Sequence, residues 1–177
     1  VKVNQMREVV EEVLDAGKAY DYGLEAGSKS ELLSVLAMNE NHNALTILNG
    51  FKDYDYLKLA MLGRKLGRKI IVVIEKYSEL SELLNVAKDM EVEPIIGFRV
   101  RLSSKGSGKW SSSGGEKAKF GLSVPELLNA ISFLKSNGKE DLVKLMHFHI
   151  GSQITDIRTI KDAITEGGRI YTRLVQM

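Results

Sequence analysis

Short β-rich segments alternate with amphipathic helical segments along this chain of 177 residues. The predicted strands follow one another at a usual step of about 25 residues, with ends near positions 2, 24, 48, 75, 101 and 149. A step of this length is typical of a right-handed βα unit, in which a helix connects two parallel strands. The sequence therefore predicts a parallel sheet with helical connections.

The strands are predicted over residues 1–3, 20–24, 44–48, 70–74, 94–100 and 142–150. The run 70–74 is continuously apolar and β-branched, as is typical of a parallel strand buried on both faces. Helices are predicted over 5–16, from a capping box of Ser28 and Glu31, over 54–66, along the stripe 80–87, from Pro125, and over 156–175.

Six βα units in strict alternation favour an α/β fold of the (β/α)₈ TIM barrel type, truncated to about six units. A doubly wound open sheet is the structural alternative, because a βα repeat alone does not separate the two. No Gly-x-Gly-x-x-Gly motif follows the first strand. Nothing in the sequence therefore favours a dinucleotide-binding sheet.

The composition is that of an ordinary globular protein, with 44% hydrophobic and 27% charged residues. The 25 basic and 23 acidic residues nearly balance, which gives no reason to expect a nucleic-acid or membrane-surface partner. The absence of cysteine excludes disulfides and thiolate metal sites, and it fits a cytoplasmic protein. No apolar run reaches the roughly 18 residues of a membrane span.

Reactive side chains follow the predicted strands, and in a barrel these positions share the rim that carries the active site. Lys2 is the most informative, because a lysine at a strand end can form a Schiff base with a carbonyl cofactor. A lysine on its own in such a place is more commonly just solvated. The other candidates are Asn4, Glu25, Gly27, Ser28, Asn49, Gly50, Glu75, Arg99, Arg101, His147, His149, Gly151, Ser152 and Gln153.

His147 and His149 are expected on one face of the last strand, with Phe148 on the other. Such a pair is commonly structural, held by hydrogen bonds inside a barrel. An imidazole can also stack on an aromatic cofactor, and the Gly151–Ser152 turn can offer donors to a phosphate. Metal binding by the two histidines is a third possibility, but no further ligand is evident nearby.

A Gly/Ser-rich, basic loop is predicted over residues 102–123, and it carries the only tryptophan, Trp110. Its composition is typical of a disordered surface insertion. The alternative is a lid that closes over a bound substrate. The stretch 106–109 is not a P-loop, because the glycine spacing differs and no helix follows.

Five stretches together carry a resemblance to a known family: 1–5, 23–29, 48–53, 99–122 and 148–154. They resemble the pyridoxal-phosphate decarboxylases of fold type III, the alanine-racemase-like barrels, and among these the biosynthetic arginine decarboxylases. The most specific stretch combines Gly-Lys-Trp at 108–110 with Ser-Gly-Gly-Glu-Lys at 113–117. Ornithine and diaminopimelate decarboxylases share only the Lys-Phe-Gly that ends this region.

The resemblance implies a role for each matched residue. Lys2 would carry pyridoxal 5'-phosphate as a Schiff base and assist proton return, and His149 would stack on the pyridine ring. Glu25 would line the same site, and Ser152 would contact the cofactor phosphate. Arg99 matches an arginine near the cofactor, with Arg101 as the alternative register. Lys2 and His149 would thus be catalytic, and no residue is expected to bind a metal, although Mg²⁺ is possible by resemblance.

The resemblance also implies that residues 1–177 form only part of such an enzyme. An N-terminal segment, the last barrel units and a C-terminal β domain are expected to be missing. The 177-residue chain alone is therefore expected to be inactive, to bind the cofactor poorly and to self-associate through open strand edges. The intact parent is expected to be a homo-oligomer that converts L-arginine to agmatine and CO₂ for spermidine and polyamine biosynthesis.

Two other functions stay open. The first is a pyridoxal-phosphate decarboxylase that acts on another basic amino acid, such as ornithine, lysine or diaminopimelate. The second is a barrel that binds the cofactor without catalysing a reaction. The long loop argues against the second, because such carriers are usually compact. In each case the expected ligand is a small molecule.

Overall fold

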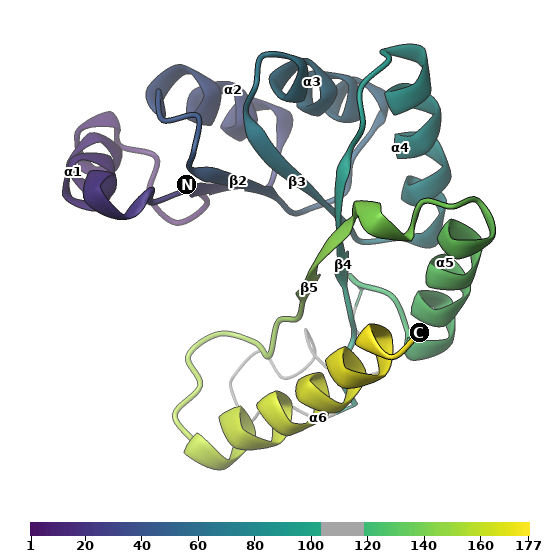
Figure 1. Cartoon of the computed structure of the whole chain (residues 1–177). Helices are drawn as coiled ribbons and strands as arrows, with labels where there is room; N and C mark the ends of the chain where they lie inside the picture. Colours follow the sequence, from purple (N-terminus) through teal and green to yellow (C-terminus); the bar gives the residue numbers. More distant parts are fainter. Residues whose placement is uncertain (104–118) are drawn as a thin grey trace. The chain divides into compact units, whose positions relative to one another are not determined.

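The computed structural model describes residues 1–103 and 119–177 (Figure 1). Two compact units make up the chain. The first consists of Val1–Gly97 with Asp141–Leu145, and the second of Phe98–Glu140 with Met146–Met177. Among the described residues, no helix combines the length and the apolar character needed to cross a membrane.

Five strands form one sheet in the order β1-β2-β3-β4-β5, which is also their order along the chain. Their bounds are Leu24–Ala26, Leu45–Leu48, Lys69–Ile74, Ile95–Arg99 and Val143–His147. β1 pairs with β2, and β2 with β3, in parallel register. A doubly wound sheet reverses its strand order at a switch point. The strands that the structure describes show no such reversal, so the doubly wound alternative is not supported.

Six α-helices connect or follow these strands: α1 Arg7–Gly17, α2 Lys29–Met38, α3 Tyr54–Lys65, α4 Tyr77–Asp89, α5 Val124–Ser136 and α6 Ile157–Val175. Short 3₁₀ turns lie at Lys18–Tyr20 and Glu140–Leu142. In the first unit, α2, α3 and α4 pack side by side along one face of the sheet (Figure 1). All six predicted helices are therefore present, with ends shifted by a few residues.

The core of the first unit centres on β3. Its residues from Ile70 to Ile74 are all at most 5% exposed, as the continuous apolar run predicts. Leu57 and Met61 of α3 and Leu80 of α4 are buried against the sheet at 0–1% exposure. At the Gly63 position of α3, an added Cβ would come within 2.4 Å of the Ile70 side chain, so helix and strand approach closely there.

Side-chain caps fix the starts of α2, α3, α5 and α6. Ser28, Asp53 and Asp156 accept backbone N–H bonds at the starts of α2, α3 and α6. Ser123 and Glu126 form a full capping box at α5, with Pro in the first turn. The box predicted at Ser28 is half formed, because the Glu31 carboxylate accepts the N–H of Gly27 at 2.8 Å.

Three predicted strands differ from the structure. Residues 1–3 form no strand, since Asn4 accepts the N–H of Met6 and leads the chain directly into α1. The strand predicted over 20–24 begins only at Leu24, because a 3₁₀ turn continues α1 and Asp21 adopts a left-handed φ of 51°. The strand predicted over 142–150 ends at His147.

The second unit packs helix α6 against the segment that follows β5. A Cβ added at Gly167 of α6 would lie 2.7 Å from the Phe148 ring, so the aromatic ring rests on the helix backbone. The two ends of the predicted loop 102–123 are joined, because Arg101 N–H donates to Leu122 O at 2.8 Å and Leu122 N–H to Arg99 O at 2.7 Å. Residues 104–118 of that loop lie outside the described residues.

Candidate functional site

The N-terminal residue of the chain lies beside Glu25, the predicted carboxylate of the first unit. The amino group of Val1 donates to the backbone oxygen of Glu25 at 2.8 Å and lies 3.9 Å from Glu25 Oε2. Lys2 is the next residue, and it is exposed. The structure thus places the residue that precedes Lys2 in contact with Glu25 of β1.

Glu25 is held in place by Asn49, which directly follows β2. Asn49 Nδ2 donates to Glu25 Oε1 at 3.2 Å, and the Asn49 backbone N–H donates to Ala26 O at 3.0 Å. The pairing of the two strands explains this contact. Glu25 of β1 is the partner of Ile47 of β2, and Asn49 lies two residues further along the chain. The ends of the two strands therefore place Asn49 next to the Glu25 carboxylate.

The backbones after β1 and β2 approach each other closely at two glycines. Gly50 has a φ of +75°, and a Cβ there would lie 2.4 Å from the carbonyl oxygen of Gly27. Only glycine fits that position, for conformational and for steric reasons. The backbone segments that follow β1 and β2 are therefore in close contact at this point.

A second polar group at this rim was not among the predicted site residues. Lys52 and Glu79 are 5% and 4% exposed, and Lys52 Nζ lies 3.6 Å from Glu79 Oε2. Glu75, a strand-end candidate without an assigned role, is 1% exposed and accepts the N–H of Gly50 at 2.9 Å. A lysine in a loop and a glutamate in the first turn of a helix are ordinary in sequence, so no local signal marks this pair.

Tyr56 of α3 contacts the end of β1. Its hydroxyl donates to the carbonyl oxygen of Ala26 at 3.0 Å, and the side chain is buried. Burial, with smaller contributions from Glu31, Glu25 and Glu79, raises the pKa of the phenol well above its usual value. Tyr56 therefore stays a neutral hydrogen-bond donor that fixes the end of β1.

The two candidate arginines of the second unit have different surroundings. The Arg99 guanidinium lies 5.5 Å from the centre of the Phe120 ring. Arg101 Nη2 lies 3.0 Å from Glu126 Oε2. Hydrogen bonds from the backbone and hydroxyl of Ser123, followed by the charge of Arg101, lower the pKa of Glu126. Arg101 is thus bound to the cap of α5, whereas Arg99 lies against an aromatic ring.

His149 lies in a turn after β5 and not on the strand, so the prediction that it shares a strand face with His147 was wrong. Its Nδ1 accepts the N–H of Gly151 at 3.0 Å, and Gly151 has a φ of +106° that turns the chain there. Since Nδ1 is an acceptor, a neutral His149 carries its proton on Nε2. Ser152 follows in the same turn and is exposed.

The predicted residues are divided between the two units. Lys2 and Glu25 belong to the first, and Arg99, His149 and Ser152 belong to the second. Within the described ranges 1–103 and 119–177, no group of three His, Cys, Asp or Glu side chains is arranged to hold a metal ion.

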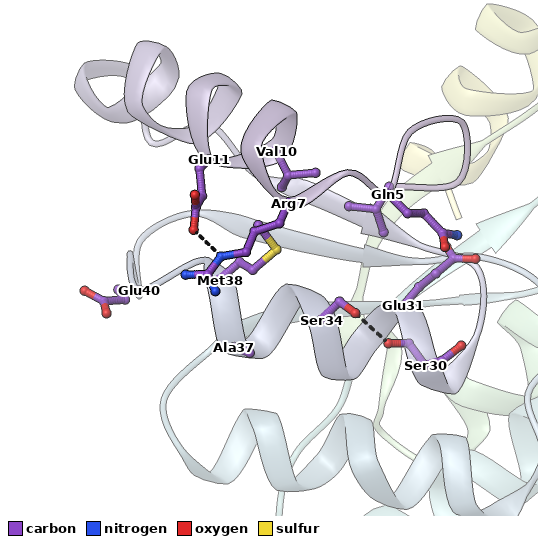
Figure 2. A pocket seen from close by; sticks show the side chains of 11 residues that line it. Gln5, Arg7, Val10, Glu11, Ser30, Glu31, Ser34, Ala37, Met38 and Glu40 are labelled. Carbon is purple, nitrogen blue, oxygen red and sulfur yellow. Dashed lines mark hydrogen bonds and ion pairs between the residues drawn. The ribbon is translucent and has the colours of Figure 1, made fainter.

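A cavity of about 540 Å³ lies between α1 and α2 in the first unit (Figure 2). Arg7 and Glu11 form an ion pair of 2.7 Å at its wall. Val1 and Glu31 also line it, but none of the five predicted site residues does. The predicted site residues therefore lie outside the lining of this cavity.

Strands in chain order that alternate with helices define an α/β domain. The chain belongs to the family of the pyridoxal binding domain of pyridoxal-dependent decarboxylases, whose sequence profile matches residues 1–177. The predicted resemblance is thereby confirmed.

Relatives of known name support this membership. The chain is 50% identical to the biosynthetic arginine decarboxylase of Bacteroides thetaiotaomicron over 100% of its length and 28% of the relative's. It is 49% identical to that of Vibrio vulnificus, over 98% of this chain and 28% of the relative. The chain thus spans about 28% of the length of the curated relatives it matches.

Solved structures of other decarboxylases have a similar fold. The biosynthetic arginine decarboxylase of Campylobacter jejuni superposes with a TM-score of 0.84 at 40% identity, covering 95% of this chain and 27% of that one. The diaminopimelate decarboxylase of Helicobacter pylori superposes with a TM-score of 0.73 at 22% identity, covering 94% and 41%. The second likeness concerns the fold alone.

Proposed function

We propose that residues 1–177 are the pyridoxal-binding part of an arginine decarboxylase, which releases CO₂ from L-arginine and yields agmatine. The observation that carries this proposal is the 50% identity to a biosynthetic arginine decarboxylase along the entire chain. A cytoplasmic location, a homo-oligomeric parent and a role for Mg²⁺ stay predictions.

The proposed fold is an alanine-racemase-like (β/α)₈ barrel to which this chain contributes about six βα units. Sequential strand order and helices on one face of the first unit's sheet support it. The remaining units and a C-terminal β domain would belong to a longer parent, in keeping with the 28% of the relatives' length that is covered.

The residues present fit pyridoxal phosphate. Lys2 offers an exposed primary amine, and the residue before it contacts Glu25. The glycine pair Gly27 and Gly50 leaves out the side chains that would fill this rim. In the second unit, His149 offers a flat exposed imidazole, and Ser152 offers a hydroxyl in a turn.

Each group then has a defined task. Lys2 Nζ would hold the cofactor covalently and later return a proton to the substrate carbon. Asn49 keeps Glu25 Oε1 oriented, and the hydrogen bond from Gly151 to Nδ1 fixes the His149 ring for stacking. When bound, pyridoxal phosphate supplies an electron sink for the bond that breaks as CO₂ leaves.

The test is product formation by the protein that contains this chain. Purified protein with pyridoxal phosphate is given arginine, ornithine, lysine or diaminopimelate in parallel, and the amine products and CO₂ are quantified. We expect agmatine from arginine as the main product. A preference for one of the other amino acids would reassign the substrate, and cofactor binding without any CO₂ release would indicate a non-catalytic barrel.

A further inference from the structure

We infer that the buried ion pair of Lys52 and Glu79 positions the Glu25 carboxylate of the candidate site. The pair acts through the segment 49–53, which follows β2 and contacts the ends of β1 and β3. Neither residue was predicted from the sequence. The inference rests on the proposed function, because it takes Glu25 to line the pyridoxal site.

The ammonium group of Lys52 is enclosed by three acceptors. Nζ donates to Gly50 O at 2.6 Å and also to Val73 O, and Glu79 Oε2 lies at 3.6 Å. The side chain is 0% exposed. The two carbonyls accept hydrogen bonds from the ammonium, and the Glu79 carboxylate balances its charge at ion-pair distance. Lys52 thereby ties the carbonyl of Gly50 to the end of β3.

Glu79 completes the arrangement from the first turn of α4. Its Oε1 accepts the N–H of Lys52 at 3.1 Å, and its Oε2 accepts the N–H of Glu75 at 2.8 Å. Glu75 in turn accepts the N–H of Gly50 at 2.9 Å. Gly50 is therefore held at both its N–H and its carbonyl by groups that depend on this pair.

Asn49 carries the effect to the site. It precedes Gly50, and its Nδ2 donates to Glu25 Oε1 at 3.2 Å. Because Gly50 is fixed on both sides, the backbone of Asn49 is fixed as well, and its amide stays directed at Glu25. The effect of the ion pair thus reaches the Glu25 carboxylate through Gly50 and Asn49, which are neighbours in the segment 49–53.

Stability alone does not account for a charged pair at this depth. Two buried charges lose hydration, and apolar side chains of the same volume often stabilise a fold as well or better. Apolar replacements would, however, leave the carbonyls of Gly50 and Val73 and the N–H groups of Lys52 and Glu75 without these partners. What the pair specifically supplies is order in the segment beside Glu25.

The first test uses Lys52→Met/Glu79→Gln in the protein that contains this chain. Because both charges are removed together, its melting temperature is expected to stay closer to wild type than that of either single variant. Its dissociation constant for pyridoxal phosphate is expected to rise about ten-fold or more, as for the loss of a hydrogen bond to a charged group. Wild-type affinity in the double variant overturns the inference.

A second variant, Asn49→Ala, tests the relay and decides the question even where the double variant fails to fold. It should weaken cofactor binding to a similar extent. Combined with Lys52→Met/Glu79→Gln, it should add no further loss, because residues on one path are not independent. Unchanged affinity in Asn49→Ala, or fully additive losses, contradicts the relay.

Leu83→Ala is the matched control, since Leu83 lies on the same helix as Glu79 and is 0% exposed. It should lower the melting temperature without weakening cofactor binding. Amide hydrogen exchange without cofactor gives a readout that does not depend on the proposed function. Exchange at Asn49 and Gly50 should be faster in the double variant than in Leu83→Ala. Equal exchange overturns the inference, whereas a wild-type protein that binds no pyridoxal phosphate overturns the proposed function.

Discussion

Lys52 and Glu79 are 27 residues apart in sequence, yet the ammonium of one lies 3.6 Å from the carboxylate of the other in the interior of the first unit. The pair joins the segment after β2 to the first turn of α4. Because both side chains are buried, the loss of one partner leaves an uncompensated charge, and this consequence is measurable.

Glu79→Ala is expected to lower the free energy of unfolding by about 3–5 kcal/mol, the cost of stranding a buried charge. Urea unfolding followed by circular dichroism measures it. Glu82→Ala on the same helix is the control, because Glu82 is partly exposed, and it should stay within about 0.5 kcal/mol of wild type. Equal stability of the two variants would show that the pair is not buried in solution.

Gly50→Ala is expected to destabilise the protein by about 1–3 kcal/mol, because a residue with a Cβ is strained in this conformation. The clash with Gly27 O adds to that cost. Gly168→Ala in α6 is the matched control, since no described atom lies within 4 Å of the added Cβ. That helical position should gain about 0.5–1 kcal/mol. Thermal unfolding of both variants checks the opposite signs.

Glu126→Gln tests the pH dependence of the α5 cap. The hydrogen bonds from Ser123, then the charge of Arg101, lower the pKa of Glu126 below its ordinary 4.5. A carboxyl with a lowered folded pKa stabilises the fold above its ordinary pKa, and that contribution is lost as the pH falls through the folded value. The variant should therefore melt below wild type at neutral pH, with the difference shrinking below pH 4.5. A difference independent of pH would exclude the ionised cap.

Lys2→Ala is expected to abolish covalent attachment of pyridoxal phosphate. Borohydride reduction followed by peptide mapping should place the cofactor on Lys2 in the wild-type protein and on no residue of the variant. Lys18→Ala, another exposed lysine near the same helix, is the control and should keep the label. A reducible absorption band that persists in Lys2→Ala would contradict the assignment.

The 177-residue chain produced on its own is expected to form no agmatine. It spans about 28% of the length of the arginine decarboxylases it matches, so a large part of such an enzyme would be missing from the assay. The full-length Bacteroides relative serves as the positive control under identical conditions. Decarboxylation of arginine by the purified chain alone would overturn this prediction.

Local pattern was enough to predict much of the fold. The run 70–74 became the buried strand β3, and Ser28 and Pro125 mark the starts of α2 and α5. The strand predicted over 1–3 and the extension of β5 to residue 150 were wrong, because a side-chain hydrogen bond at Asn4 and a turn at Gly151 override strand propensity. In both places the deciding interaction is a hydrogen bond between residues close in sequence, and a hydrophobic pattern does not reveal such bonds.

For the candidate site as well, some residues could be predicted from the sequence and others could not. From the sequence alone, Lys2 and Glu25 could be proposed together, since motif order and strand ends are properties of the chain itself. Only the tertiary structure showed that Asn49 orients Glu25, and that Lys52 and Glu79 hold the segment between them. A buried ion pair forms between residues distant in sequence, and its worth depends on the exclusion of water, which the packed fold alone creates.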